Sequence, residues 1–167
     1  DAPTVLLLHG FPSSSHMFRN LIPDLAAQYR VIAPDYPGFG YSSAPPVDEF
    51  DYSFARLADV IEGFTDKLGL TSYVLYMQDY GGPVGIRLAM KHPERLRGIV
   101  VQNAVVSIEG WDPVNTAPLQ AYWKARTPET EKPVRDIISA EGTKWQYVTG
   151  EPQPVLRRPD GERPQFA

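Results

Sequence analysis

The residues with the clearest chemical potential form the stretch MQDYGG at positions 77–82. An apolar, strand-like run enters this stretch, and a helix-like pattern follows it at once. This is the setting of a nucleophile elbow, a sharp strand-to-helix turn that pushes its central side chain out over the sheet. The central residue is Asp79, and a carboxylate there can attack an alkyl carbon and form an ester. The competing interpretation is that Asp79 caps the following helix, as aspartate often does.

Two further turns carry related patterns. HGFP at residues 9–12 follows another apolar run, and DYPGFGYS at residues 35–42 follows a third. The backbone N–H groups after such a strand and after the nucleophile form the two halves of an oxyanion hole. The predicted donors are therefore the N–H groups of Phe11 and Tyr80. The predicted supporting residues of the two turns are His9, Gly10, Pro12, Gly81 and Gly82.

These turns must be held by strands that alternate with helices. Apolar runs predict four strands, at residues 4–8, 29–33, 72–77 and 97–101. Helical spacing predicts one helix over 54–68, with Gly69 just past its end, and a second helix that starts at Pro83. Such alternation indicates parallel βαβ units, which is an α/β fold. In these sheets ligands bind beyond the carboxyl ends of the strands, so we expect the turns to converge at one sheet edge.

The three motifs, in this order and at this spacing, resemble the α/β-hydrolase fold family. Within it they resemble the branch with an aspartate nucleophile, which holds epoxide hydrolases and haloalkane dehalogenases. The resemblance covers about residues 4–110. It implies that Asp79 is the nucleophile, that Phe11 and Tyr80 donate to the oxyanion, and that a helical cap follows. We therefore predict a partial α/β-hydrolase core, with a parallel sheet and flanking helices, at residues 1–107 and a partial cap at residues 108–167.

The chain departs from the family pattern in its histidines. Family members place a catalytic acid and a catalytic histidine after the cap. This chain has three histidines: His9 in the HGFP turn, His16 at a helix start and His92 beside a proline. We predict that His9 supports its loop, that His16 lies at the surface and that His92 is structural. The base that activates water is then missing, and we expect the chain to be a partial sequence.

The choice of substrate depends on residues around the nucleophile. Dehalogenases of this family usually place a tryptophan directly after the nucleophile and often an asparagine after the HG pair, whereas this chain has Tyr80 and Phe11. Cap tyrosines protonate the ring oxygen in epoxide hydrolases of the family. Tyr122 and Tyr147 could do so here, or they could be aromatic core residues of the cap. The predicted function is therefore epoxide-hydrolase-like. The alternatives are a haloalkane or haloacid dehalogenase-like hydrolase, and a non-catalytic ligand-binding module or inactive fragment.

The composition of the chain excludes several classes of function and partner. The 167 residues are 43% hydrophobic and 22% charged, which is typical of a folded globular chain. A net charge of −4 argues against a nucleic-acid partner, and the absence of cysteine excludes disulfides and thiolate chemistry. No apolar run approaches the ~20 residues of a membrane span, and no two histidines have metal-binding spacing. We expect a small-molecule substrate and water as partners, no cofactor, no metal, no membrane partner and a cytoplasmic location.

Overall fold

The computed structural model describes residues 2–114 and 116–150 of the chain. These residues belong to two compact units, Asp1–Trp111 and Asp112–Ala167. The predicted boundary at 107/108 lies a few residues before this division. Each unit is described separately below.

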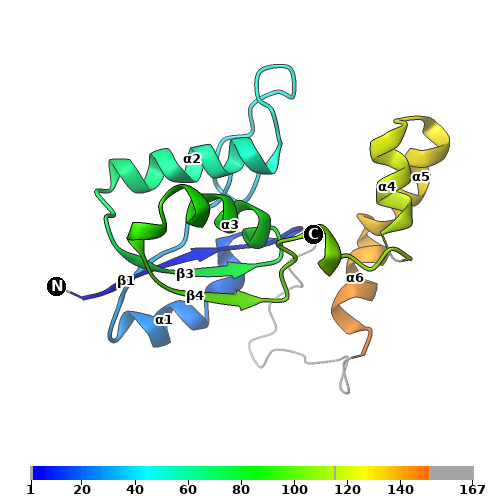
Figure 1. The fold of residues 1–167 in the computed structure, drawn as a ribbon. Coiled ribbons are helices and arrows are strands. Elements are labelled where there is room, and N and C mark those ends of the chain that lie inside the picture. The colour runs from blue at the N-terminus through cyan, green and yellow to red at the C-terminus, as the bar shows by residue number, and fades with distance from the viewer. Residues whose placement is uncertain (1, 115, 151–167) are drawn as a thin grey trace. The chain divides into compact units, whose positions relative to one another are not determined.

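The first unit is built on a four-stranded parallel sheet. Its strands are β1 (Thr4–Leu8), β2 (Arg30–Ile32), β3 (Tyr73–Gln78) and β4 (Leu96–Gln102), in the order β2-β1-β3-β4. Helix α1 (Leu21–Ala26) covers one face, and helices α2 (Phe54–Lys67) and α3 (Gly81–Lys91) cover the other (Figure 1). Short 3-10 turns lie at Ser15–Phe18, Pro93–Arg95 and Ile108–Gly110. The predicted α/β fold, with a parallel sheet and flanking helices, is confirmed.

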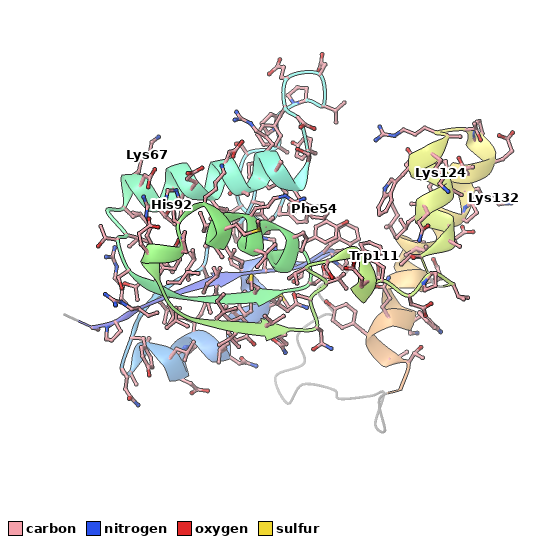
Figure 2. All side chains as sticks on the ribbon, in the orientation of Figure 1. Phe54, Lys67, His92, Trp111, Lys124 and Lys132 are labelled. Atoms are coloured by element: carbon pink, nitrogen blue, oxygen red, sulfur yellow. The ribbon has the colours of Figure 1, made fainter. Side chains whose placement is uncertain are left out.

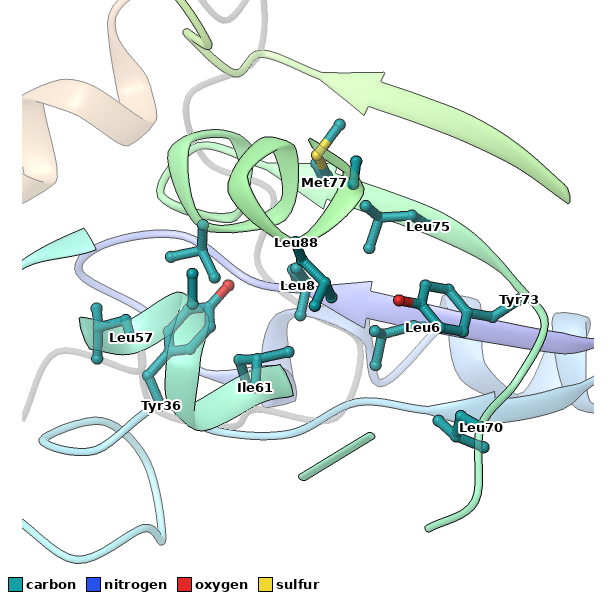
Figure 3. Packing of buried hydrophobic residues seen from close by; sticks show 13 residues of the cluster. Leu6, Leu8, Tyr36, Leu57, Ile61, Leu70, Tyr73, Leu75, Met77 and Leu88 are labelled. Atoms are coloured by element: carbon teal, nitrogen blue, oxygen red, sulfur yellow. The ribbon is translucent and has the colours of Figure 1, made fainter. Parts of the chain in front are cut away.

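The core explains why the strands are apolar along their whole length. Leu6 and Leu8 of β1 pack toward α2 and α3, whereas Val5 and Leu7 pack toward α1. Figure 3 shows the first of these clusters, in which Ile61 of α2 and other buried side chains meet the sheet. A strand with both faces covered cannot alternate apolar and polar residues, so it appears in the sequence as a continuous apolar run.

Helix α2 has clear signals at both ends. The Ser53 side chain accepts a hydrogen bond from the N–H of Arg56 and so caps the first turn. At the other end, Gly69 has φ +65°, and the N–H of Leu70 donates to the carbonyl of Thr65. This is a Schellman motif, and it confirms the predicted position of Gly69.

Helix α3 begins earlier than the sequence pattern predicts. Its first residue is Gly81, not Pro83. The first four N–H groups of a helix have no intrahelical partner, so a proline in the first turn removes no hydrogen bond. The chain therefore becomes helical directly after the turn at Asp79.

The second unit is helical where it is described. It contains α4 (Ala117–Lys124), α5 (Pro128–Ile137) and α6 (Ala140–Val148). A capping box between Thr127 and Thr130 starts α5. That this second unit is part of a cap domain over the active site stays a prediction. In the described part of the chain, neither unit has a helix with the length and apolar character that a bilayer span requires.

Candidate active site

The candidate site lies where the strands end, because the register of the sheet brings their following turns together. Leu8 pairs with Met77 and Gln78 pairs with Gln102. Continuing the first pairing by two residues places Gly10 beside Asp79. Asp79 has φ +48°, in the left-handed region that non-glycine residues seldom adopt. Since α3 begins two residues later, Asp79 occupies the conformation of a nucleophile elbow.

The carboxylate of Asp79 is held by the neighbouring loop. The N–H of Phe11 donates to Asp79 Oδ1 at 2.8 Å. The N-cap residue of α3 is Tyr80, and no side chain caps the helix. The interpretation of Asp79 as a helix cap is therefore wrong. Its carboxylate faces an N–H from a loop 68 residues away in sequence.

The HGFP loop can approach Asp79 only because residue 10 is glycine. A Cβ atom at Gly10 would lie 2.4 Å from Asp79 Cβ and 2.4 Å from Gln78 Oε1. The next peptide bond, between Phe11 and Pro12, is cis. The loop therefore brings its backbone, rather than a side chain, against the nucleophile.

Aromatic side chains form an apolar wall beside the carboxylate. The Tyr80 ring stacks on Phe11 with centroids 5.3 Å apart and meets Phe54 edge-on at 4.9 Å. Burial raises the pKa of the Tyr80 phenol, and the Asp79 charge raises it further. The phenol therefore stays protonated and can donate. No hydrogen bond joins the Tyr80 N–H to Asp79 among the described contacts, so its oxyanion role stays a prediction.

His9 is buried beneath the same loop. Its Nδ1 lies 3.0 Å from the carbonyl oxygen of Gly10, and its Nε2 lies 3.8 Å from Asp35 Oδ1. Burial lowers the pKa of His9 by more than the opposing effects of the Gly10 carbonyl and of the Asp35 and Asp79 charges raise it. The imidazole is therefore neutral in the folded protein near neutral pH.

This lowered pKa predicts a dependence of stability on pH. The unfolded chain titrates His9 near its ordinary pKa of 6.5, so between that value and the folded pKa the unfolded state binds more protons. The stabilisation is present above pH 6.5 and is lost as the pH falls through the folded pKa. Urea unfolding across this range measures it. In His9→Gln this part of the pH dependence should disappear, and an unchanged slope would contradict the assignment.

The other two histidines lie elsewhere. His16 is exposed on the 3-10 turn, and no described hydrogen bond or ion pair joins it to Asp79. His92 Nε2 lies 2.6 Å from Glu62 Oε1, at the far end of α3, which is about 16 Å long at 1.5 Å per residue. Figure 2 shows His92 at the opposite end of the unit from Phe54, which lies near the strand arrowheads. None of the three is positioned as a base for water at Asp79.

Asp35 is a site-supporting residue that the sequence pattern did not single out. Its carboxylate accepts from the N–H groups of Ser15 at 2.7 Å and Tyr41 at 2.9 Å. Burial works against ionisation, but these two N–H groups, the Ser15 side chain and His9 together outweigh it and lower the pKa of Asp35. The sequence feature that could have identified Asp35 is its place as the first residue of the turn at 35–42.

Tyr122 and Tyr147 lie on α4 and α6 of the second unit. The Tyr122 ring lies under the guanidinium of Arg126 at 5.8 Å, and Tyr147 is about half exposed. Their role as cap acids stays a prediction. The described residues include no group of three acidic, histidine or cysteine side chains that could hold a metal ion.

Comparison with known proteins agrees with this geometry. A family model described as the alpha/beta hydrolase fold matches residues 3–141. The chain is 50% identical over 123 residues to an uncharacterized hydrolase of Saccharomyces cerevisiae, YNR064C, covering 74% of this chain and 42% of that protein. It is 42% identical over 107 residues to a haloalkane dehalogenase of Psychrobacter cryohalolentis, covering 64% of this chain and 35% of that protein.

Solved structures give the same result. The crystal structure of a putative ancestral haloalkane dehalogenase, AncHLD2, matches with a TM-score of 0.68 and 35% identity, over 87% of this chain and 49% of that one. Haloalkane dehalogenase DbeA from Bradyrhizobium elkani matches with a TM-score of 0.68 and 32% identity, over 86% and 48%. The chain thus spans half or less of the length of these relatives. From the family match, the parallel sheet and the elbow at Asp79, we conclude that the chain belongs to the α/β-hydrolase fold family.

Proposed function

We propose that the protein is a hydrolase that cleaves the carbon–halogen bond of haloalkanes through an ester on Asp79. The observation that carries the proposal is the Asp79 carboxylate at the elbow, with one oxygen bound by the Phe11 N–H. The names of the similar proteins favour a halide as leaving group over the epoxide that the sequence alone suggested. Epoxide hydrolysis remains the second candidate.

In the first step, one carboxylate oxygen attacks carbon. Oδ1 is bound by the Phe11 N–H, whereas Oδ2 has no hydrogen bond among the described residues. Oδ2 is therefore the attacking atom. The Oδ2–carbon bond forms, the carbon–halogen bond breaks, and its electron pair leaves with the halide. The aromatic side chains of Phe11, Phe54 and Tyr80 give the alkyl group an apolar surface.

In the second step, water attacks Cγ of the ester. Negative charge then develops on Oδ1, which the Phe11 N–H already contacts, and hydrogen bonds to such an oxyanion stabilise the transition state. Collapse releases the alcohol and restores the carboxylate, and the proton of the water passes to a base. Since none of the three histidines is positioned for this, the base is supplied from outside the described residues.

The second candidate, epoxide hydrolysis, is favoured by the hydroxyl group of Tyr80, the residue after the nucleophile. Tyr80 offers a neutral O–H directly after the nucleophile in the chain. An O–H can protonate an opening epoxide oxygen as well as solvate a departing halide. The aspartyl ester is common to both reactions, so the substrate decides between them.

Covalent trapping tests the proposal. The protein is incubated with 1-bromobutane or with 1,2-epoxybutane, and the peptide that contains Asp79 is analysed by mass spectrometry. We expect a butyl ester and released bromide with the first compound. A hydroxybutyl ester formed only with the second would replace the halide proposal by the epoxide one. Modification with neither compound would contradict both.

Tyr80→Phe is expected to slow alkylation of Asp79 by bromobutane about 10-fold, because one hydrogen bond to a charged group contributes about 1.5 kcal/mol. The matched control is Tyr52→Phe, since the Tyr52 hydroxyl donates to the carbonyl of Pro45 in a loop. That control should react at the wild-type rate. Equal rates for all three proteins would show that the phenol takes no part in leaving-group departure.

A further inference from the structure

We propose that the ring of Phe11 determines substrate specificity and selects arylalkyl compounds, whose aromatic group stacks on it while a nearby carbon meets Asp79. This names the substrate class of the same site and so rests on the proposed function. Three features of the Phe11 ring carry it: its tie to the nucleophile, its fixed orientation and its open surface.

The Phe11 ring is tied to the nucleophile through its own backbone. The N–H of Phe11 donates to Asp79 Oδ1 at 2.8 Å, and only the Cα and Cβ atoms separate that nitrogen from the ring. The loop can come this close because Gly10 has no Cβ atom to meet Asp79. A substrate group that packs against the ring therefore lies beside the carboxylate, and a short carbon linker can reach the attacking oxygen.

Neighbouring aromatic rings hold the Phe11 ring in one orientation. The Tyr80 ring stacks on it, with centroids 5.3 Å apart and planes inclined by 25°. Phe39 meets it edge-on, with centroids 6.4 Å apart. Tyr80 is held in turn by Phe54, whose ring lies 4.9 Å away at 87°. The Phe11 ring is therefore fixed before any substrate arrives, and a preorganised surface binds its ligand at a lower entropic cost.

The Phe11 ring nevertheless keeps an open surface. Phe11 is 37% exposed, whereas its aromatic neighbours Phe39, Phe54 and Tyr80 are partly buried. Tyr80 covers one face of the Phe11 ring, so the exposed part lies on the surface that this stack leaves free. An aryl group placed there can stack on the ring or meet it edge-on, the two arrangements that aromatic pairs prefer.

Stacking distinguishes an aromatic substrate from a saturated one of similar shape. A cyclohexyl group has at least as much apolar surface as a phenyl group, so burial alone gives it no disadvantage. The interaction between two aromatic rings adds to burial and corresponds to about a 2- to 10-fold gain in affinity. Because the aryl group lies away from the reacting bonds, we expect this gain in the second-order rate of alkylation.

Two bromides that differ only in their ring test the selectivity. The protein is treated with (2-bromoethyl)benzene or (2-bromoethyl)cyclohexane, and the ester on Asp79 is quantified by mass spectrometry. Each rate is divided by the rate at which acetate in solution displaces the same bromide, which removes differences in intrinsic reactivity. We expect the wild-type protein to prefer the phenyl compound by about 2- to 10-fold. A ratio of one or less would overturn the proposal.

Substitutions at Phe11 assign the preference to its ring. Phe11→Leu retains the backbone N–H and an apolar side chain but has no aromatic ring, so the phenyl preference should disappear. Phe11→Tyr retains the ring and should preserve it. The matched control is Phe50→Leu, because the Phe50 ring packs against Tyr52 and Arg56 in the segment before α2. The ratio of two rates is independent of the fraction of folded protein. A preference that persists in Phe11→Leu would refute the role of Phe11.

Unreactive alcohols test the same surface without any catalysis. 2-Phenylethanol and 2-cyclohexylethanol carry the two rings but no leaving group. We expect 2-phenylethanol to bind about 2- to 10-fold more tightly in titrations followed by NMR, and its ring current to shift the Phe11 amide proton. Equal or weaker binding than 2-cyclohexylethanol, or no shift of that proton, would overturn the proposal, whatever the protein catalyses.

These measurements separate the failure of the specificity from the failure of the function. If 1-bromobutane forms an ester on Asp79 but the phenyl preference is absent, only the specificity is wrong. If no bromide or epoxide forms an ester, the proposed function fails, and the binding of the two alcohols decides the role of the Phe11 ring.

Discussion

Asp79→Asn is expected to lower the rate of ester formation by about 10⁴-fold or more, as for loss of a covalent nucleophile. The amide nitrogen or oxygen of asparagine cannot supply the negative oxygen that attacks carbon. The variant should nevertheless fold, because asparagine tolerates the left-handed conformation at φ +48° and its oxygen can still accept from the Phe11 N–H.

The matched control is Asp59→Asn. Asp59 is a half-exposed aspartate of α2 that pairs with Lys91, away from the elbow. Both variants are treated with bromobutane, and ester formation is measured by mass spectrometry after proteolysis. Asp59→Asn should be modified at the wild-type rate. Ester formation at the wild-type rate on another residue of the first variant, with no conversion of the asparagine back to aspartate, would exclude Asp79 as nucleophile.

Gly81→Ala is expected to destabilise the fold by about 3 kcal/mol or more, the upper range for overpacking in a core. A Cβ atom at Gly81 would lie 2.2 Å from the carbonyl oxygen of Leu8 and 3.0 Å from its Cβ. The first contact is with the backbone of the central strand β1, so no side-chain rotation can relieve it. Helix α3 would have to move away from the sheet, and the elbow would move with it.

Gly63→Ala is the matched control for this substitution. Gly63 lies exposed within α2, and a Cβ atom there would meet nothing within 4 Å. Alanine should therefore stabilise the helix by about 0.8–1.0 kcal/mol. Urea unfolding of both variants gives the two free energies. Equal stability of Gly81→Ala and wild type would contradict the close packing of α3 on β1.

Local patterns in the sequence were sufficient for the architecture. The apolar runs, the helical stripe that ends at Gly69 and the turn at Asp79 predicted the order of strands and helices, because strand burial, helix termination and tight turns each depend on a few neighbouring residues. For the strands and helices that were predicted, the differences are confined to element ends, such as the start of α3 at Gly81. There, tertiary packing admits residues that local preference would exclude.

The function of the site depended on contacts that the sequence does not display. Asp79 could equally have capped α3. What excludes this is that no side chain caps α3 and that the Asp79 carboxylate instead accepts from the N–H of Phe11, 68 residues away. Similarly, nothing in the HGFP pattern indicates that His9 meets the N–H of Tyr36, 27 residues further on. The sequence by itself determined which residues reach the carboxyl edge of the sheet. The tertiary structure decided what each does there, because hydrogen-bond partners are set by the register of strands distant in the chain.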